Sequence, residues 1–305
     1  MEYTRKLIES DPRCHEIFQK IMLKNQLHWR RFDGSHDVLR WLRNFSGDRE
    51  IYLALILADG IMYYSLDEVR SLWGLILTNR VKQWLLADTF GDGPLPNIDE
   101  WFHQYLRGKC VFLGYGPASK SGHSQLYYFK QSHSIGKLQY LEFHELLHGA
   151  NNLNGIERVF LVDDMVGSGD QAKTTWNKKF GGRSLNDVQQ ENAHLKFVYL
   201  ALVGFGDGKK EIEDTTPMKV ILGHELDERS KCFSDTSMIY VDDSERSEAS
   251  TVMEEKGKML YEHPLGYADM QLAVAFCHNT PDNSLPVIWK RLADEGWWPL
   301  FERFE

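Results

Sequence analysis

The chain has 305 residues, a length that predicts one domain of roughly 200 residues with a smaller companion. Its apolar share of 42% and charged share of 26% are typical of a globular protein rather than a disordered one. Lysine and arginine number 35 against 44 acidic residues, a formal net charge of -9. This charge argues against broad nucleic-acid binding and against attachment to an anionic membrane.

The four cysteines are too far apart for a CxxC zinc site or a dense disulfide framework, which favours a reducing compartment. The first residues are charged and lack the apolar segment of a signal peptide. The most apolar window, Ile51–Tyr64, is interrupted by Asp59 and Gly60 and falls short of the ~20 residues that span a bilayer. We therefore expect a soluble, cytoplasmic protein.

The front of the chain has the three- and four-residue apolar spacing of helices. The spacing predicts helices over Ile17–Phe32 and Val38–Phe45 and a buried helix over Ile51–Tyr64. A capping pattern at Ser65 predicts the start of another helix. We expect a helical N-terminal domain over residues 1–107.

From residue 108 onward, short apolar runs alternate with helical patterns. Strands are predicted over Cys110–Tyr115, Val159–Val162, Phe197–Val203 and Lys219–Leu222, with Gln125–Phe129 as a further candidate, and helices over Leu138–His148 and Gln171–Phe180. This alternation predicts an α/β fold with a mostly parallel sheet covered on both faces, over residues 108–305. Residues 235–255 are polar and acidic, and we expect them to be irregular, with Met238–Val241 as a candidate edge strand.

The most informative stretch runs from Val159 to Ala172. An apolar strand leads into two adjacent carboxylates, then a small loop that contains two glycines, then a helix. Backbone amides of such a loop and of the helix start form a cradle for a phosphate group. The paired carboxylates, Asp163 and Asp164, suit ribose hydroxyls or a magnesium ion. The predicted phosphate-binding residues are Val166, Gly167, Ser168, Gly169, Asp170 and Gln171.

This stretch resembles the phosphoribosyltransferase signature, in which an apolar strand precedes two acidic residues, three variable residues and Thr/Ser-Gly-x-Thr. The acidic pair falls on Asp163 and Asp164, and the loop falls on Ser168 and Gly169. The resemblance implies that the loop binds the 5′-phosphate of phosphoribosyl pyrophosphate (PRPP) and that the aspartates hold the ribose hydroxyls. Gln171 departs from the closing Thr of the family pattern, which puts ordinary salvage activity in question.

A second stretch, Gly114–His123, follows the first core strand, where the family places its pyrophosphate-binding loop. Ser119, Lys120 and Ser121 offer hydroxyls and a cation for a diphosphate leaving group. The open alternative is a solvated surface loop. We expect the catalytic groups to be Lys120 with Asp163 and Asp164, the two acids also being the candidate Mg²⁺ ligands.

The C-terminal stretches Leu265–Asp269, Phe276–Trp289 and Trp298–Arg303 resemble a divergent branch of phosphoribosyltransferase-like proteins in bacterial conflict (anti-phage) systems. Some members of that branch accompany retron reverse transcriptases. The resemblance implies an effector role and a protein partner such as a reverse transcriptase complex, without establishing a substrate. Residues His278–Asn283 are a candidate hood over an acceptor base, with a simple turn as the alternative.

Other motifs leave alternatives open. Residues His144–His148 match HExxH, in which two helical imidazoles bind zinc and Glu145 acts as general base. Asparagines end that helix directly afterwards, and no convincing third His or Glu ligand follows, since Glu157 is too close. A loose GxGxxA dinucleotide pattern at Gly167 begins too far from its strand.

The sequence therefore predicts a phosphoribosyltransferase-like effector that binds PRPP or a related ribose phosphate with Mg²⁺. It would transfer the phosphoribosyl group or cleave the bond at the anomeric carbon. The alternatives are a catalytically inactive PRPP-sensing or scaffold protein of a defence complex and, third, a zinc metalloprotease.

Overall fold

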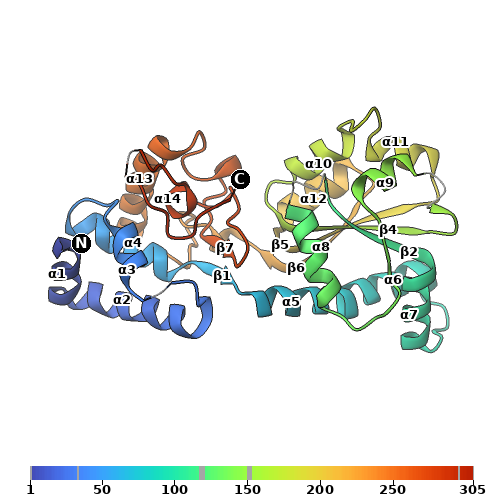
Figure 1. Cartoon of the computed structure of the whole chain (residues 1–305), viewed down its shortest axis with the longest axis horizontal. Helices are drawn as coiled ribbons and strands as arrows, with labels where there is room; N and C mark the ends of the chain where they lie inside the picture. The colour runs from blue at the N-terminus through green and yellow to red at the C-terminus, as the bar shows by residue number, and fades with distance from the viewer. Residues whose placement is uncertain (1, 33, 117–120, 150–152, 295, 305) are drawn as a thin grey trace. The chain divides into compact units, whose positions relative to one another are not determined.

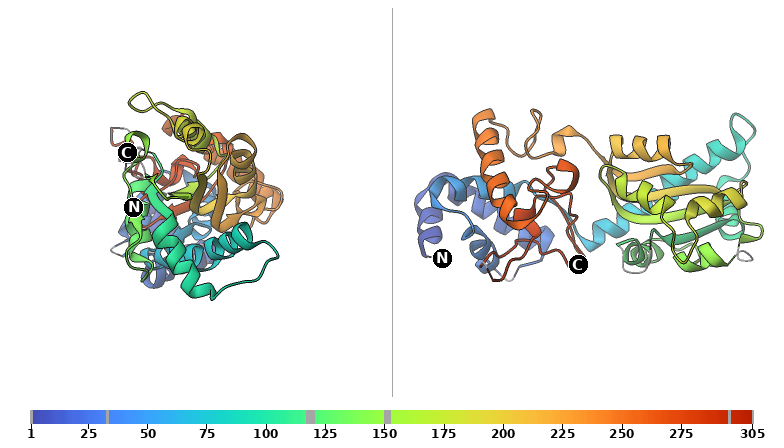
Figure 2. Two further views of the ribbon diagram at one scale, coloured as in Figure 1. Left: turned by 90° about the vertical axis from the view of Figure 1, so that its right-hand side faces the viewer. Right: turned by 90° about the horizontal axis from the view of Figure 1, so that it is seen from above.

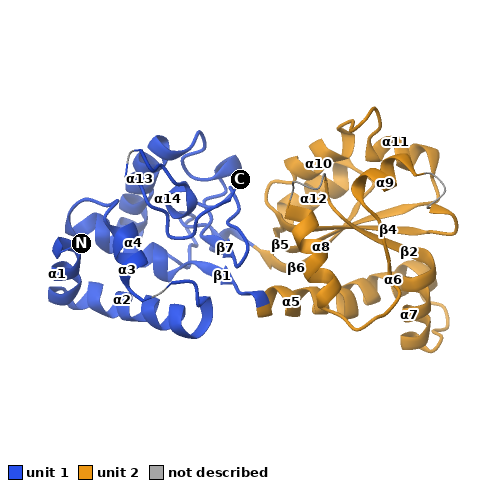
Figure 3. Ribbon diagram, in the orientation of Figure 1, with its two compact units in different colours: residues 1–66, 227–305 blue, residues 67–226 orange. Residues whose placement is uncertain are grey.

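The computed structural model describes residues 2–32, 34–116, 121–149, 153–294 and 296–304. They form two compact units: unit 1 comprises Met1–Leu66 with Asp227–Glu305, and unit 2 comprises Asp67–Leu226 (Figure 3). The division expected at residue 107 coincides with neither boundary. Residues 67–107 belong with the large sheet, where Asp88 pairs with Arg158 at 2.5 Å and with Lys196 at 2.7 Å.

A five-stranded, fully parallel sheet in the order β3-β2-β4-β5-β6 forms the centre of unit 2 (Figure 1). The predicted strands at residues 159–162, 197–203 and 219–222 lie wholly within strands of this sheet, and the one at 110–115 does so up to Gly114, which confirms the predicted α/β class. The strands are β2 (Cys110–Gly114), β3 (Gln139–Tyr140), β4 (Arg158–Val166), β5 (Lys196–Phe205) and β6 (Lys219–Leu226).

Helices cover both faces of this sheet (Figures 1 and 2). On one face, Trp176 packs edge-on against Phe197 of β5 with ring centroids 5.0 Å apart. On the other, Phe112 of β2 stacks on Phe129 at 5.1 Å. The first face carries α9 (Phe143–His148), α10 (Asp170–Asn177), α11 (Leu185–Glu191) and α12 (Gly206–Thr215). The remaining helices of unit 2 are α5 (Leu66–Leu75), η2 (Ile76–Val81), α6 (Lys82–Phe90), α7 (Ile98–Lys109) and α8 (Ser121–Gln131).

The candidate strand at residues 125–129 is wrong, because these residues lie inside α8. Aromatic residues favour strands in isolation. Here the tertiary contacts decide: Phe129 stacks on Phe112, and the buried Gln125 accepts a hydrogen bond from the Trp73 indole at 3.1 Å. The predicted helix over residues 138–148 is correct only for its second half, since β3 precedes α9.

Unit 1 packs the N-terminal helices with the C-terminal part of the chain around one apolar core. The indole N–H of Trp41 donates to the Val287 carbonyl at 2.7 Å, which joins the two ends of the sequence. The elements are α1 (Glu2–Ser10), α2 (Pro12–Lys24), η1 (Asn25–Trp29), α3 (His36–Leu42), α4 (Gly47–Asp59), β1 (Met62–Tyr64), η4 (Glu228–Ser230), α13 (Asp243–Leu260), η5 (Tyr267–Asp269), β7 (Val274–Phe276) and α14 (Pro286–Trp289).

Two predictions in unit 1 are wrong. The buried helix expected through Tyr64 ends at Asp59, and Met62–Tyr64 pairs in parallel with β7, more than two hundred residues later in the sequence. The segment expected to be irregular contains α13, an 18-residue helix that Asp242 caps by accepting from the Glu245 backbone N–H at 2.9 Å. The apolar pattern of this helix is weak in the sequence, because small residues such as Ala249 occupy part of its buried face.

Membrane-spanning helices and disulfides are both missing from the described part of the chain. None of its helices combines the length and apolar character needed to cross a bilayer. The four cysteines are free thiols, and Cys14, Cys110 and Cys232 are buried.

Candidate functional site

The strand order of unit 2 places a topological switch point between β2 and β4. From β2 the chain crosses to β3 on one side, whereas β4, β5 and β6 extend the sheet in the other direction. Loops that leave neighbouring strands in opposite directions open a crevice at the carboxyl ends, where ligands of such sheets bind. Both predicted ligand loops start here, since Gly114 ends β2 opposite Val162 of β4, one residue before the acid pair.

Asp163 is buried, with only 2% of its surface exposed. Its Oδ1 accepts from the Ser121 hydroxyl at 2.7 Å and from the Asp164 backbone N–H at 2.9 Å, and its Oδ2 accepts from the Tyr199 hydroxyl at 2.7 Å. Burial, and to a smaller extent the charge of Asp164, raise the pKa of Asp163 to about 7, although its three hydrogen bonds act in the opposite direction.

Asp164 is the more accessible acid of the pair, and its residue is partly exposed. Strand β4 continues past both acids, and Met165 and Val166 pair with Val203 and Gly204 of β5. Because successive side chains of a strand point to opposite faces, the two carboxylates do not lie side by side on one face.

The loop after β4 packs closely against α12. Gly169 caps α10 with a φ of +87°, and a Cβ there would lie 2.7 Å from the Gly208 carbonyl oxygen. A Cβ on Gly208 would lie only 1.9 Å from the Gly167 carbonyl oxygen. Glycines at these positions therefore let the loop and the helix approach backbone to backbone, which holds the loop against α12.

The polar side chains of this loop bond to one another. The Ser168 hydroxyl donates to Asp170 Oδ2 at 2.9 Å, and Lys173 lies 3.2 Å from Asp170 and 2.7 Å from Glu211. An anion at Ser168 must therefore replace the Asp170 carboxylate. Of the other predicted phosphate-binding residues, Gln171 is exposed, whereas the buried Val166 can offer only its backbone.

The predicted pyrophosphate-binding residues divide at the start of α8. Ser119 and Lys120 lie outside the described residues. Ser121 begins α8, and its hydroxyl donates to Asp163 instead of facing a leaving group. Gly122 brings this helix start onto the sheet, because a Cβ there would lie 2.4 Å from the Tyr115 nitrogen.

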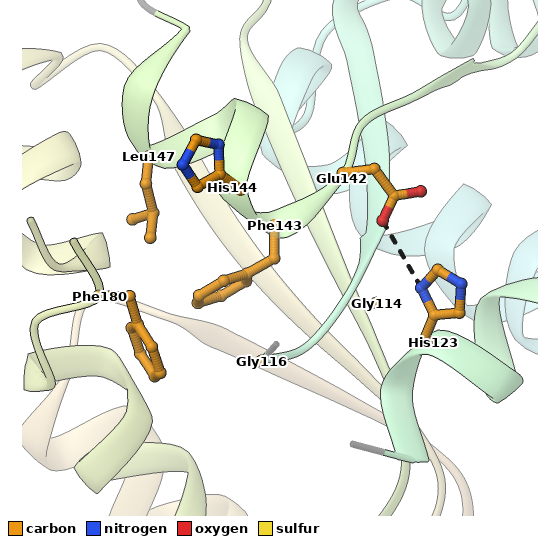
Figure 4. A pocket seen from close by; sticks show the side chains of 8 residues that line it. All are labelled: Gly114, Gly116, His123, Glu142, Phe143, His144, Leu147 and Phe180. Carbon is orange, nitrogen blue, oxygen red and sulfur yellow. Dashed lines mark ion pairs between the residues drawn. The ribbon is translucent and has the colours of Figure 1, made fainter. Parts of the chain in front are cut away.

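A cavity of about 200 Å³ adjoins the end of β2 (Figure 4). The Phe143 and Phe180 rings meet edge to face, with centroids 5.2 Å apart, and His123 lies 3.6 Å from Glu142. A cavity of this size holds a small ring, since roughly 150 Å³ of apolar space accommodates benzene. It is lined by Gly114, Gly116, His123, Glu142, Phe143, His144, Leu147 and Phe180.

Two residues of the HExxH stretch, His144 and Leu147, line this cavity. Glu145 accepts from the Glu142 backbone N–H at 2.8 Å in a capping box that starts α9. His148 lies 3.2 Å from the Phe180 carbonyl oxygen, which holds Phe180 against α9. No group of three or more His, Cys, Asp or Glu side chains suited to a metal occurs among the described residues. This geometry speaks against the zinc metalloprotease alternative.

Sequence reasoning missed Tyr199 and Tyr115. Tyr199 stands in an otherwise apolar buried strand, and a buried tyrosine hydroxyl usually needs a hydrogen-bond partner. That signal pointed to a polar group nearby, but the partner, Asp163, lies 36 positions earlier in the sequence. The Tyr115 ring packs edge-on against Tyr199 at 4.8 Å, and its hydroxyl donates to the Ala172 carbonyl.

The donor set fits a magnesium ion that arrives with its ligand. Mg²⁺ is usually bound through one or two carboxylates together with phosphate oxygens of the substrate and waters. Asp164 is a partly exposed carboxylate at the switch point, whereas the oxygens of Asp163 already accept three hydrogen bonds. Asp164 is thus the more accessible carboxylate of the pair for such an ion, and the ligand and water would supply its other coordination positions.

A parallel sheet with an acid pair and a glycine loop at its switch point defines a phosphoribosyltransferase-like α/β protein. The PRTase-CE family model matches residues 38–303, and the chain belongs to this family. The match extends over parts of both units.

Comparison with curated proteins found no match. Among solved structures, the chain is similar to one titled "Structure of AQ2163 protein from Aquifex aeolicus", at 12% identity over 65% of this chain and 86% of that one. The TM-score of 0.31 is too low for that likeness to carry an argument.

Proposed function

We propose that the protein binds PRPP or a related ribose phosphate with Mg²⁺ at the C-terminal ends of strands β2 and β4. It then transfers the phosphoribosyl group or cleaves the bond at the anomeric carbon. The observation that carries this proposal is the placement of the acid pair and the glycine loop together at the switch point. Membership of the phosphoribosyltransferase-like PRTase-CE family supports it.

In this proposal, the backbone amides of Ser168 to Asp170 hold the 5′-phosphate, and Asp164 holds ribose hydroxyls or the metal. Departure of pyrophosphate leaves positive charge at the anomeric carbon, so the main work of the site is positioning and charge stabilisation. Mg²⁺, when bound, neutralises charge on the leaving pyrophosphate. Lys120 remains the proposed cation for the same group.

Calorimetric titration of the full chain with PRPP, with and without MgCl₂, tests this proposal. We expect saturable binding that weakens at least tenfold in Asp164→Asn. Asp214→Asn is the matched control, because it removes an exposed acid of α12 from the same unit. Absence of binding by the wild-type chain, or equal losses in both variants, would contradict the proposal.

A second candidate function is a ligand sensor or scaffold that has lost turnover. The observation in its favour is the Ser168–Asp170 contact, which places a carboxylate at the predicted phosphate position. Pyrophosphate release, measured alongside PRPP binding, separates the two functions. Binding with release indicates a transferase or hydrolase, whereas binding without release over many hours, also when nucleobases are added as acceptors, indicates the sensor.

We also propose that the protein acts as an effector in anti-phage defence with a protein partner such as a reverse transcriptase complex. This part rests on the resemblance of the stretches 265–269, 276–289 and 298–303. Phage plating on cells that carry the complete gene neighbourhood tests it. We expect protection that Asp164→Asn abolishes and Asp214→Asn retains; equal protection by both variants would remove the effector role of this site.

A further inference from the structure

Asp163 has no room for a ligand. Its two oxygens accept three hydrogen bonds, which fill three of the roughly four lone-pair positions of a carboxylate. Only 2% of the Asp163 surface is exposed, so no sugar hydroxyl or hydrated cation reaches the remaining lone-pair position of its carboxylate. Two of the donors, Ser121 and Tyr199, belong to α8 and β5, so the carboxylate of β4 joins three separate elements.

Strand geometry separates the roles of the two acids. Leu161 pairs with Tyr199 in register, and Asp163 lies two residues after Leu161, on the same face of the sheet. Asp164 then points to the opposite face. We propose that Asp163 is a positioning residue that holds Ser121 and Tyr199 in place, and that Asp164 is the acid of the pair that meets the ligand.

The positioning extends to both loops at the switch point. The Tyr199 ring packs edge-on against Tyr115, at the end of β2, with ring planes at 85°. The Tyr115 hydroxyl donates to the Ala172 carbonyl of α10, the helix that follows the glycine loop. The network therefore connects the start of α8 and the start of α10 to one carboxylate. These contacts set the distance between the two helix starts. The identity of the ligand rests on the proposed function, whereas the network itself does not.

Hydrogen–deuterium exchange on the ligand-free full chain tests the network. We expect Asp163→Ala to speed exchange of the first backbone amides of α8 and of the Tyr115 segment tenfold or more. Asp163→Asn should exchange like the wild type, because its amide oxygen still accepts from Ser121 and from the Asp164 N–H, and its NH₂ donates to the Tyr199 oxygen. Equal exchange in both variants, or a uniform change throughout unit 2, would overturn the positioning role.

If Asp163→Ala does not fold, Ser121→Ala and Tyr199→Phe replace it, since each removes a single donor. They are judged by the same local acceleration at α8 and at Tyr115.

Calorimetry with ribose 5-phosphate and MgCl₂ tests the division of roles. We expect Asp164→Asn to weaken binding at least tenfold and Asp163→Asn to change it less than threefold, because a positioning amide needs no charge. Equal losses would overturn the inference. If the wild-type chain binds neither ribose 5-phosphate nor PRPP, the proposed function fails, while the exchange experiment still decides whether Asp163 holds Ser121 and Tyr199 in place.

Discussion

Asp163 and Asp164 are neighbours in the sequence but lie in different surroundings. The sequence predicts the pair and its place at the end of an apolar strand, because local composition carries that information. It does not predict that Asp163 is enclosed, since the enclosing groups come from Ser121 and Tyr199, 42 and 36 positions away. The family pattern predicts the same role for the two acids, whereas the structure places them in different environments.

The raised pKa of Asp163 predicts how stability depends on pH. Its folded-state pKa of about 7 exceeds the unfolded value near ~4, so the folded state binds the extra proton between these values. This contribution to the free energy of unfolding is complete below pH ~4 and is lost as the pH rises through about 7. Asp163→Asn cannot titrate and should therefore lose less stability between pH 5 and 8 than the wild type.

Urea unfolding of wild type and Asp163→Asn at several pH values measures this difference. We expect the stability of the variant relative to the wild type to increase by a few kcal/mol from pH 5 to 8. A difference between the two proteins that stays constant with pH would contradict the raised pKa.

At the scale of elements, apolar runs in the sequence predict the central strands correctly but do not predict the other elements reliably. Strands β2, β4 and β5 are buried along nearly their whole length, so composition alone identifies them. Helix α8 and strand β1 depend on partners distant in sequence, such as Phe112 for Phe129 and β7 for β1. Local sequence patterns do not show which distant residues will contact these elements.

Gly208→Ala tests the packing of the glycine loop against α12. The new Cβ would lie 1.9 Å from the Gly167 carbonyl oxygen, so the loop or the helix must move. We expect about 2–4 kcal/mol of destabilisation in urea unfolding, as for other overpacked positions, together with loss of ribose-phosphate binding. Gly108→Ala is the control, because nothing lies within 4 Å of its Cβ. It should be neutral or stabilise α7 by up to ~1 kcal/mol; similar effects of both changes would refute the close packing.

The cap of α13 provides a second test at this scale. Asp242→Ala removes the acceptor for the Glu245 N–H and should cost about 1 kcal/mol in thermal or urea unfolding. Asp235→Ala is the matched control, because the Asp235 side chain is fully exposed and its carboxylate lies 3.8 Å from Arg246, at the long end of an ion pair. Equal stability of the two variants would mean that the cap contributes nothing.

At the scale of the whole molecule, the chain builds unit 1 from both of its ends and unit 2 from its middle. The sequence predicts a helical front and an α/β part, and both are present. The change from helical to strand-like sequence patterns near residue 107 marks the first strand of the sheet and not a boundary between the two units. Helices α5 and α6 precede that strand but belong to the same unit, since Trp73 of α5 contacts Phe129 of α8 and Trp84 of α6 contacts Phe160 of β4.

This organisation predicts which fragments fold. A fragment of residues 67–226 contains a complete unit and should give cooperative urea unfolding with native-like tryptophan fluorescence. A fragment of residues 108–305 lacks α5, α6 and α7, exposes Phe160 and leaves Arg158 without Asp88. It should be aggregated or loosely folded, and a cooperative transition of the second fragment but not the first would contradict the two-unit division.

A crystal structure of the chain with ribose 5-phosphate and Mg²⁺ tests the central claim most directly. We predict the phosphate on the backbone amides of Ser168 to Asp170, with the Asp170 carboxylate displaced from the Ser168 hydroxyl. The ribose should lie beside Asp164, while Asp163 keeps its bonds to Ser121 and Tyr199. A ligand bound away from the carboxyl edge between β2 and β4, or no ligand at saturating concentration, would contradict the assignment of this edge as a sugar-phosphate site.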